Sequence, residues 1–180
     1  MRYRMMPDGG RQILSLLIPG DLCDIHGSLT QGVSHSISTI TQLRIAAIPR
    51  SSIAALCEQH PNIQAALCLD ALQEEAILRE RIVSLGRRDA RGRISHLLCE
   101  LFWRYEAIGL TASSVFQIPL TQTELGDILG LTQVHVNRVL RVLREQRLIK
   151  VENRKLQICN VNGLQDIAEV SREYLGFRET

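Results

Sequence analysis

Hydrogen-bonding and basic side chains recur along one face of the segment spanning residues 133–144. Four aliphatic residues at helical spacing predict the buried face of this segment: Val136, Val139, Leu140 and Leu143. The opposite face carries a polar and basic set: Gln133, Val134, His135, Asn137, Arg138 and Arg141. Asparagine and arginine each form paired hydrogen bonds with base edges in the major groove of DNA. The pattern therefore favours a helix that contacts DNA bases over a helical hairpin with a solvated basic face.

A shorter helix precedes this one, and the residues between the two favour a tight turn. Thr121 lies three residues before Glu124, the spacing of a capping box, and Gly130 suits the left-handed end of a helix. Thr132 is placed to cap the second helix, and Gly126 lets the two helices cross closely. Apolar pairs flank both caps as hydrophobic staples: Leu120 with Leu125, and Leu131 with Val136. These signals together predict a helix-turn-helix.

Charge is distributed unevenly along the 180 residues, whose net charge is +2. Residues 133–155 contain seven basic and two acidic side chains, so this segment is +5 and the remainder is −3. The basic residues are Arg138, Arg141, Arg144, Arg147, Lys150, Arg154 and Lys155. Positive charge concentrated on one helix-turn-helix is typical of phosphate binding.

The overall composition is that of an ordinary globular protein, with 45% hydrophobic and 22% charged residues. No apolar run reaches the length of a membrane span, and the N-terminus lacks the apolar core of a signal peptide. Five cysteines show no metal-binding or redox spacing: Cys23, Cys57, Cys68, Cys99 and Cys159. No nucleophile–base or metal motif is present. We therefore expect a cytoplasmic protein with reduced thiols that is not an enzyme, binds no cofactor or metal and has no membrane partner.

The first 50 residues are expected to form short strands. Apolar or alternating runs cover residues 12–18, 34–41 and 43–48, and Gly and Pro residues separate them. This pattern suggests part of an antiparallel roll or barrel.

Two helices are expected next. The first covers Ser51–Gln59, with three residues directed inward: Ile53, Leu56 and Cys57. Pro61 suits the first turn of the second helix, and no Gly or Pro follows from Asn62 to Leu85. Four residues share one face of this long helix: Leu69, Leu72, Ala76 and Val83. Because apolar residues spread over further faces, the helix either packs on the β-part and on a second subunit, or is a single-chain core helix.

Residues 86–89 interrupt the helical pattern and are expected to form a hinge between domains. A helix over Asp89–Tyr105 follows, with five residues inward: Ile94, Leu97, Leu98, Leu101 and Phe102. After the helix-turn-helix, Ile149–Glu152 and Lys155–Cys159 are expected to pair as a hairpin, or wing. A last helix is expected to open at Asn162 or Gly163, with apolar residues at 164, 167, 170 and 175.

This order of parts resembles the Crp/Fnr family of bacterial transcription regulators. The resemblance is most specific over Arg91–Leu101, with R-x-R-I-x-x-L-L, and over the helix-turn-helix, with L-T-Q-x-E-L-x-x-x-L-G-L-T-x-x-x-V-N-R-V-L. The resemblance implies a homodimer with a cyclic-nucleotide-binding type of β-roll and a winged helix that binds palindromic DNA. The long helix would then be the dimerisation helix.

The sequence also departs from the family pattern. The roll is expected to be partial, because family members carry more strands before the point that matches Arg2–Met6. Gly20 is followed by Asp21 where nucleotide-binding members have Glu, and His35 takes the place of their phosphate-binding Arg. No Lys or Arg occurs from Gln12 to Leu43, so a cyclic phosphate would lack its strongest contact. We therefore expect no cyclic AMP binding in the family manner, with His26 and His35 as polar structural residues.

The resemblance further assigns roles in DNA binding. Arg138 matches the family's regular base-contacting arginine and is expected to pair with guanine. Val134 replaces a glutamate that is frequent in the family, so it would contact a thymine methyl group instead. Base or adjacent contacts are also expected from Gln133, His135 and Asn137. Contacts with phosphates or the adjacent backbone are expected from Thr121, Gln122, Arg141, Lys150, Arg154 and Lys155, and Thr132 is also expected to bind DNA. The family's cysteine-held iron–sulfur cluster is not expected here, since Cys23, Cys57 and Cys68 are too scattered and are better explained as buried, inert thiols.

The sequence thus predicts an α+β fold with a partial cyclic-nucleotide-binding-type β-roll, a long dimerisation helix and a C-terminal winged helix-turn-helix. The expected domains are 1–60 (effector), 61–86 (dimerisation helix and hinge) and 87–180 (DNA-binding). The expected partners are double-stranded DNA, a second copy of the chain and RNA polymerase. The alternative is a truncated interaction module that forms heterodimers with a full-length relative.

Overall fold

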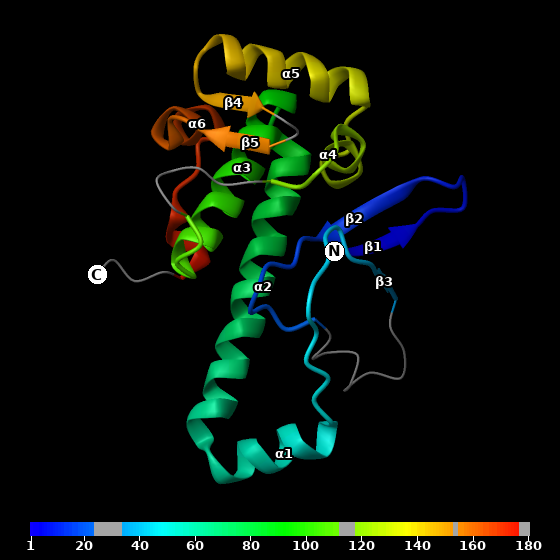
Figure 1. Cartoon of the computed structure of the whole chain (residues 1–180), viewed down its shortest axis with the longest axis vertical. Helices are drawn as coiled ribbons and strands as arrows, with labels where there is room; N and C mark the ends of the chain where they lie inside the picture. Colours follow the sequence, from blue (N-terminus) through cyan, green and yellow to red (C-terminus); the bar gives the residue numbers. More distant parts are fainter. Residues whose placement is uncertain (24–33, 112–117, 153–154, 177–180) are drawn as a thin grey trace.

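The computed structural model describes residues 1–23, 34–111, 118–152 and 155–176. One long helix, α2 (Pro61–Arg87), runs through the length of the molecule, as Figure 1 shows. Helix α5 (Gln133–Glu145) lies across one end of α2, and helix α1 (Arg50–Gln59) lies at the other end. The small N-terminal sheet packs beside the middle of α2.

The N-terminal sheet has three antiparallel strands: β1 (Arg2–Met5), β2 (Arg11–Ser15) and β3 (Ser36–Ile37), in the order β2-β1-β3. The β1–β2 hairpin places Met5 opposite Arg11 and closes through a turn in which Gly10 N–H donates to the Asp8 carboxylate at 2.9 Å. Ile13, Leu16 and Ile18 are buried and fix the hairpin to the helices behind it.

The predicted strand over residues 43–48 is wrong. These residues have no regular secondary structure. Their apolar side chains are exposed: Leu43 by 50%, Ile45 by 73% and Ile48 by 52%. The alternating run at 34–41 yields only the two-residue strand β3, with Ser34–His35 and Ser38–Thr41 outside it. An apolar run becomes a strand only where a neighbouring strand satisfies its backbone groups, and the described part of this sheet offers no fourth partner.

Helix α1 begins at Arg50, one residue earlier than predicted, and ends at Gln59 as expected. Ile53 and Cys57 are half-buried, whereas Leu56 is exposed, so its predicted inward position is wrong. Helix α2 begins at Pro61, which occupies the first turn, because a proline lacks only an N–H that has no helical acceptor there.

The break between α2 and α3 (Ala90–Ala107) is shorter than the predicted hinge. Gly86 and Arg87 are helical, and only Arg88 and Asp89 lie between the helices. Asp89 caps α3 by accepting a hydrogen bond from Gly92 N–H at 2.7 Å. The carboxylate satisfies one of the unpaired N–H groups at the start of α3, which explains why the new helix starts there.

Helix α3 forms the core of the C-terminal part. All five predicted inward residues are buried: Ile94, Leu97, Leu98, Leu101 and Phe102. Helix α4 (Gln122–Leu129), α5 and the antiparallel pair β4 (Ile149–Glu152) and β5 (Lys155–Ile158) pack around it. The predicted hairpin is confirmed, with Ile149 opposite Ile158 and Glu152 opposite Lys155.

The predicted last helix is two shorter pieces. Helix α6 (Val161–Ala168) begins one residue before the predicted start, because Asn160 caps it by accepting from Gly163 N–H at 2.9 Å. The chain then turns at Glu169, whose φ is 48°, and continues as a 3-10 helix over Arg172–Leu175. Leu164 and Leu175 are both buried, so the two pieces use the predicted apolar residues without being one helix.

The result is an α+β fold with a small antiparallel sheet, a long helix and a winged helix-turn-helix. None of the helices in the described ranges is long and apolar enough to cross a membrane.

Candidate DNA-binding surface

The helix-turn-helix forms as its capping residues predict. At the start of α4, Glu124 N–H donates to the Thr121 hydroxyl at 3.2 Å, and Thr121 N–H donates to the Glu124 carboxylate at 2.8 Å. This is the complete capping box. At the end of α4, Gly130 has a φ of 63°, a conformation that costs glycine nothing because it has no Cβ atom.

A close backbone approach fixes the crossing of the two helices. Leu131 N–H donates to the Gly126 carbonyl at 3.1 Å, and a Cβ atom on Gly126 would lie only 2.5 Å from the Leu131 carbonyl oxygen. No side chain fits at that distance from a backbone atom. The turn therefore requires glycine at this position.

Helix α5 buries the predicted aliphatic face. Val136, Leu140 and Leu143 are buried, and Val139 is partly buried against the same core. The staple residues Leu125 and Val136 are buried, with Leu120 and Leu131 packed on the core at half burial. Burial of one aliphatic stripe turns the opposite face of α5 toward solvent.

The exposed face of α5 carries the side chains predicted to contact DNA. All of these residues are exposed: Gln133, Val134, His135, Asn137, Arg138 and Arg141. Val134 is 68% exposed, which leaves its methyl groups free to contact a ligand. Arg141 lies 3.8 Å from Glu145, an exposed ion pair that holds it loosely.

Thr132 caps α5 and also orients His135. The Thr132 hydroxyl accepts from His135 N–H at 3.3 Å and lies 3.2 Å from His135 Nδ1. The contact at Nδ1 leaves Nε2 at the outer edge of the imidazole. His135 therefore presents one ring nitrogen at the N-terminal end of the exposed face.

The remaining predicted contact residues flank α5. Thr121 is exposed and Gln122 half-buried at the start of α4, and Lys150 is exposed on β4. Lys155 begins β5, directly opposite Glu152. Arg154 lies outside the described residues. The structure thus brings both helix starts and one wing strand to the same end of the molecule (Figure 1).

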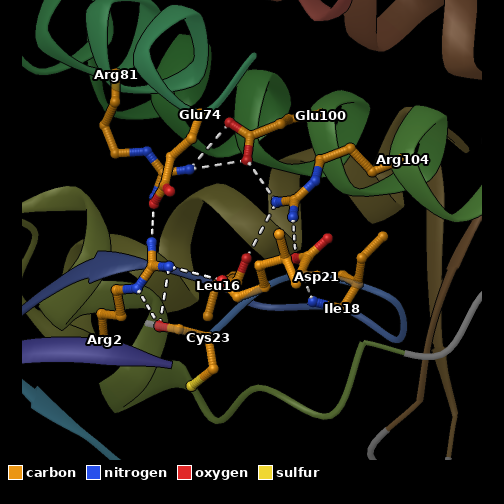
Figure 2. A network of polar contacts seen from close by, with 10 residues as sticks. Arg2, Leu16, Ile18, Asp21, Cys23, Glu74, Arg81, Glu100 and Arg104 are labelled. Carbon is orange, nitrogen blue, oxygen red and sulfur yellow. Dashed lines mark hydrogen bonds and ion pairs between the residues drawn. The ribbon is translucent and has the colours of Figure 1, made fainter. Parts of the chain in front are cut away.

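A buried ionic network, which the sequence analysis did not predict, joins the helix-turn-helix part to the long helix. Glu100 on α3 is fully buried and accepts two hydrogen bonds from Arg81 of α2, both at 2.9 Å. Arg104 lies one turn along α3, 3.5 Å from Glu100, and donates to Asp21 at 2.6 Å and to the Leu16 carbonyl at 3.1 Å. Figure 2 shows these residues in one continuous network.

The network controls the ionisation of its carboxylates. Burial alone would raise the pKa of Glu100, but Arg81 and Arg104 outweigh burial and lower it. Burial raises the pKa of Asp21, and Arg104 opposes that effect only in part. One sequence signal was available: Glu100 and Arg104, four residues apart, are the charged residues in the otherwise apolar stretch Leu97–Arg104.

Two histidines of the predicted effector domain, His26 and His35, form no recognisable ligand site in the described part of the chain. Residues 24–33, which include His26, lie outside the described part of the chain. His35 is half-buried, and its Nε2 atom has no hydrogen-bond partner among the described residues. No cluster of metal-binding side chains occurs in the ranges that the structure covers.

The cysteines are only partly the buried thiols that the sequence suggested. Cys99 is buried, and burial raises its pKa to about 12, which makes it unreactive. Cys23 and Cys57 are half-buried, but Cys68 is exposed on α2, so the prediction of a buried thiol is wrong there. Cys159 is also exposed.

Comparison with known proteins agrees with this geometry. Residues 92–167 match the Crp-like helix-turn-helix domain. The transcriptional activator protein FnrL of Cereibacter sphaeroides is 31% identical over 153 residues, which cover 83% of this chain and 61% of FnrL. The nitrogen fixation regulation protein FixK of Bradyrhizobium diazoefficiens is 27% identical over 150 residues, covering 83% of this chain and 62% of FixK.

Solved structures show the same fold. The structure of FixK2 from Bradyrhizobium japonicum matches with a TM-score of 0.73 and 25% sequence identity, covering 94% of this chain and 83% of FixK2. The Crp/Fnr-family regulator TTHA1359 from Thermus thermophilus matches with a TM-score of 0.67 at 19% identity, covering 94% of this chain and 82% of that one.

A winged helix-turn-helix with an exposed Asn/Arg face defines the class of helix-turn-helix DNA-binding domains. Within that class, the chain belongs to the Crp/Fnr family. The chain spans about 61% of the length of FnrL.

Proposed function

We propose that this chain is a sequence-specific DNA-binding transcription regulator that binds palindromic sites as a homodimer. The exposed face of α5 carries the proposal. Asn137 and Arg138 stand there beside Val134, with an aliphatic stripe buried behind them. Asn137 and Arg138 would contact base edges, and each good paired contact contributes about 1–3 kcal/mol of discrimination between bases. Phosphate contacts would come from the helix starts and the wing: Thr121, Gln122, Thr132, Arg141, Lys150, Arg154 and Lys155.

Selection of bound sequences from a random DNA library tests this proposal. A two-fold symmetric consensus, with half-sites about one helical turn apart, is the expected result. Arg138→Ala should lower the affinity for the consensus site while leaving affinity for scrambled DNA nearly unchanged. Arg172→Ala removes the same charge from the exposed 3-10 helix and is the matched control. Equal losses on consensus and scrambled DNA would refute the assignment of Arg138 to base contacts.

The exposed apolar stripe of α2 supports the homodimer. Leu69 is 66% exposed, Leu72 54% and Val83 47%. Together with Ala76, these residues lie three, four and seven residues apart, which are spacings of a coiled-coil seam. Removing this apolar surface from water is favourable, so the stripe is expected to pack against another apolar surface. A second copy of α2, packed on the same stripe, satisfies the pattern.

Leu72→Glu tests the dimer, with Leu110→Glu as the control because Leu110 is 52% exposed, close to the 54% of Leu72, and is not part of α2. Light scattering should show a monomer for the first variant and a dimer for the second. A mixed dimer on co-expression with a longer relative, together with weak DNA binding by the chain alone, would favour the alternative interaction module. Contact with RNA polymerase is a further proposal, which co-purification with the holoenzyme on promoter DNA would test.

The effector is proposed to differ from cyclic AMP. The run from Gln12 to Leu43 holds no Lys or Arg to pair with a cyclic phosphate. Calorimetric titration with cyclic AMP should give no binding heat, and the affinity for the selected DNA should not change. Micromolar binding of cyclic AMP would contradict this proposal.

A further inference from the structure

The N-terminal segment, residues 1–23, contacts helices on both sides of the break between α2 and α3. On the α2 side, Arg2 forms an ion pair with Glu74. On the α3 side, Arg104 donates to the Asp21 carboxylate at 2.6 Å (Figure 2). A segment fixed to both helices restricts rotation about the two-residue break at Arg88 and Asp89.

Strand β2 extends this contact to the helix-turn-helix itself. Arg11 Nε donates to Asp127 Oδ2 on α4 at 2.9 Å, and Arg11 Nη2 lies 2.8 Å from the same oxygen. Beside it, Gln12 Nε2 donates to the Ile128 carbonyl at 3.4 Å. The Arg11 guanidinium also lies over the Tyr3 ring, 5.8 Å from its centroid. Arg11 is therefore held by β1 on one side and by α4 on the other.

This ion pair is less open to water than a surface pair. The side chain of Arg11 is 28% exposed and that of Asp127 is 22% exposed. Solvent therefore screens the pair less than the exposed pairs on α2 and α5. Because Gly126 on α4 lies directly against Leu131 in the short turn that leads into α5, a displacement of α4 is expected to carry α5 with it.

We propose that Arg11 and Asp127 are positioning residues for DNA binding. Their ion pair holds the helix-turn-helix in the orientation that lets both α5 helices of a dimer enter successive major grooves. With the pair formed, Asn137 and Arg138 on α5 remain exposed, so the ion pair does not cover the proposed contact residues. This inference rests on the proposed function, because it concerns two DNA-binding domains acting together.

Orientation matters most when two half-sites must be bound at once. Recognition helices of a dimer need a fixed separation of about one helical turn of DNA. A helix-turn-helix that is no longer held in one orientation still binds one half-site. The second half-site then increases the affinity of the dimer for DNA by a smaller factor. The ratio of the affinities for a two-half-site DNA and a one-half-site DNA therefore measures orientation and cancels general changes in charge.

The test measures this ratio by fluorescence anisotropy for the full chain, with DNA carrying one or two copies of the selected half-site at fixed salt. Arg11→Ala and Asp127→Asn should each lower the ratio about fivefold, which corresponds to the net contribution of one typical hydrogen bond. Asp127→Asn is informative because removing a negative charge near DNA should strengthen binding to both DNAs through phosphate attraction. The charge effect strengthens binding to both DNAs and does not explain a fall in their ratio.

Two further variants complete the test. Arg4→Ala removes a charge from the same hairpin at an exposed position and should leave the ratio unchanged. The exchange of charges in Arg11→Asp with Asp127→Arg should restore the ratio, which a general loss of folding would not allow.

An unchanged ratio in both single variants, with the wild type preferring two half-sites, would overturn the positioning role alone. A wild-type chain without that preference would refute the proposed dimeric function and the positioning role together.

Discussion

Replacing Glu100 by alanine is expected to destabilise the protein by about 3–5 kcal/mol, as removal of one partner from a buried ion pair does. Glu100 is fully buried, and Arg81 is only 6% exposed, so solvent cannot replace the lost carboxylate. Arg81 would lose its hydrogen-bond acceptor. Its Nη2 atom donates two hydrogen bonds to Glu100, and its Nη1 atom has no hydrogen-bond partner among the described residues. Arg104 keeps the Asp21 carboxylate and the Leu16 carbonyl.

The assay is urea unfolding followed by circular dichroism, with the free energy of unfolding extrapolated to water. Glu106→Ala is the matched control, because Glu106 lies on the same helix in an exposed pair with Arg172 at 3.7 Å. The control should change the free energy of unfolding by less than about 0.5 kcal/mol.

A double variant separates the cost of the orphaned charge from the loss of packing. Glu100→Leu with Arg81→Met replaces the ion pair by apolar side chains of similar volume and should recover most of the loss. If Glu100→Ala cost no more than the Glu106→Ala control, the pair would not be the buried contact between α2 and α3 that the structure shows. If the double variant were as unstable as Glu100→Ala, the orphaned Arg81 charge would not explain the loss.

Three further predictions concern single positions. Gly126→Ala should destabilise the protein by about 1–3 kcal/mol in the same urea assay, because its Cβ atom would lie 2.5 Å from the Leu131 carbonyl oxygen, whereas Gly86→Ala, with open space around it, should be neutral or stabilising. Thr132→Ala should cost about 1 kcal/mol through loss of the α5 cap, and Thr132→Ser should not. Burial lowers the pKa of His96 to about 4, so the unfolded chain binds the extra proton between pH 6.5 and pH 4, and about 3 kcal/mol of stability should be lost as the pH falls through that window. His96→Gln should remove most of this slope in pH-dependent urea unfolding, and an unchanged slope would contradict the assignment.

Local signals determined the helix-turn-helix before any tertiary contact was known. The capping interactions join residues that are only a few positions apart: Thr121 with Glu124, and the caps at Gly130 and Thr132. Their spacing therefore predicts the two ends of α4 and the start of α5. The buried stripe of α5 follows from helical periodicity in the same way. These interactions are short in sequence, and the sequence therefore contains the whole of each one.

The strands of the N-terminal part were predicted less well, because a strand depends on its partner. Residues 43–48 have the composition of a strand but remain irregular and exposed. The start of helix α6 was predicted to within one or two residues, but its end was not. The helix ends before Glu169, which adopts a left-handed conformation although it is not a glycine. Neighbouring elements, which no window of sequence contains, decided both outcomes.

What the sequence determined by itself was the candidate contact surface: the caps, the crossing glycine and the Asn/Arg face of α5. What only the tertiary structure decided was how that surface is attached to the remainder of the chain. Arg11 meets Asp127 across 116 residues, and Arg104 meets Asp21 across 83. Nothing in the local pattern distinguishes these arginines from solvated ones, because an ion pair between distant residues exists only once the fold has excluded water from the space between them.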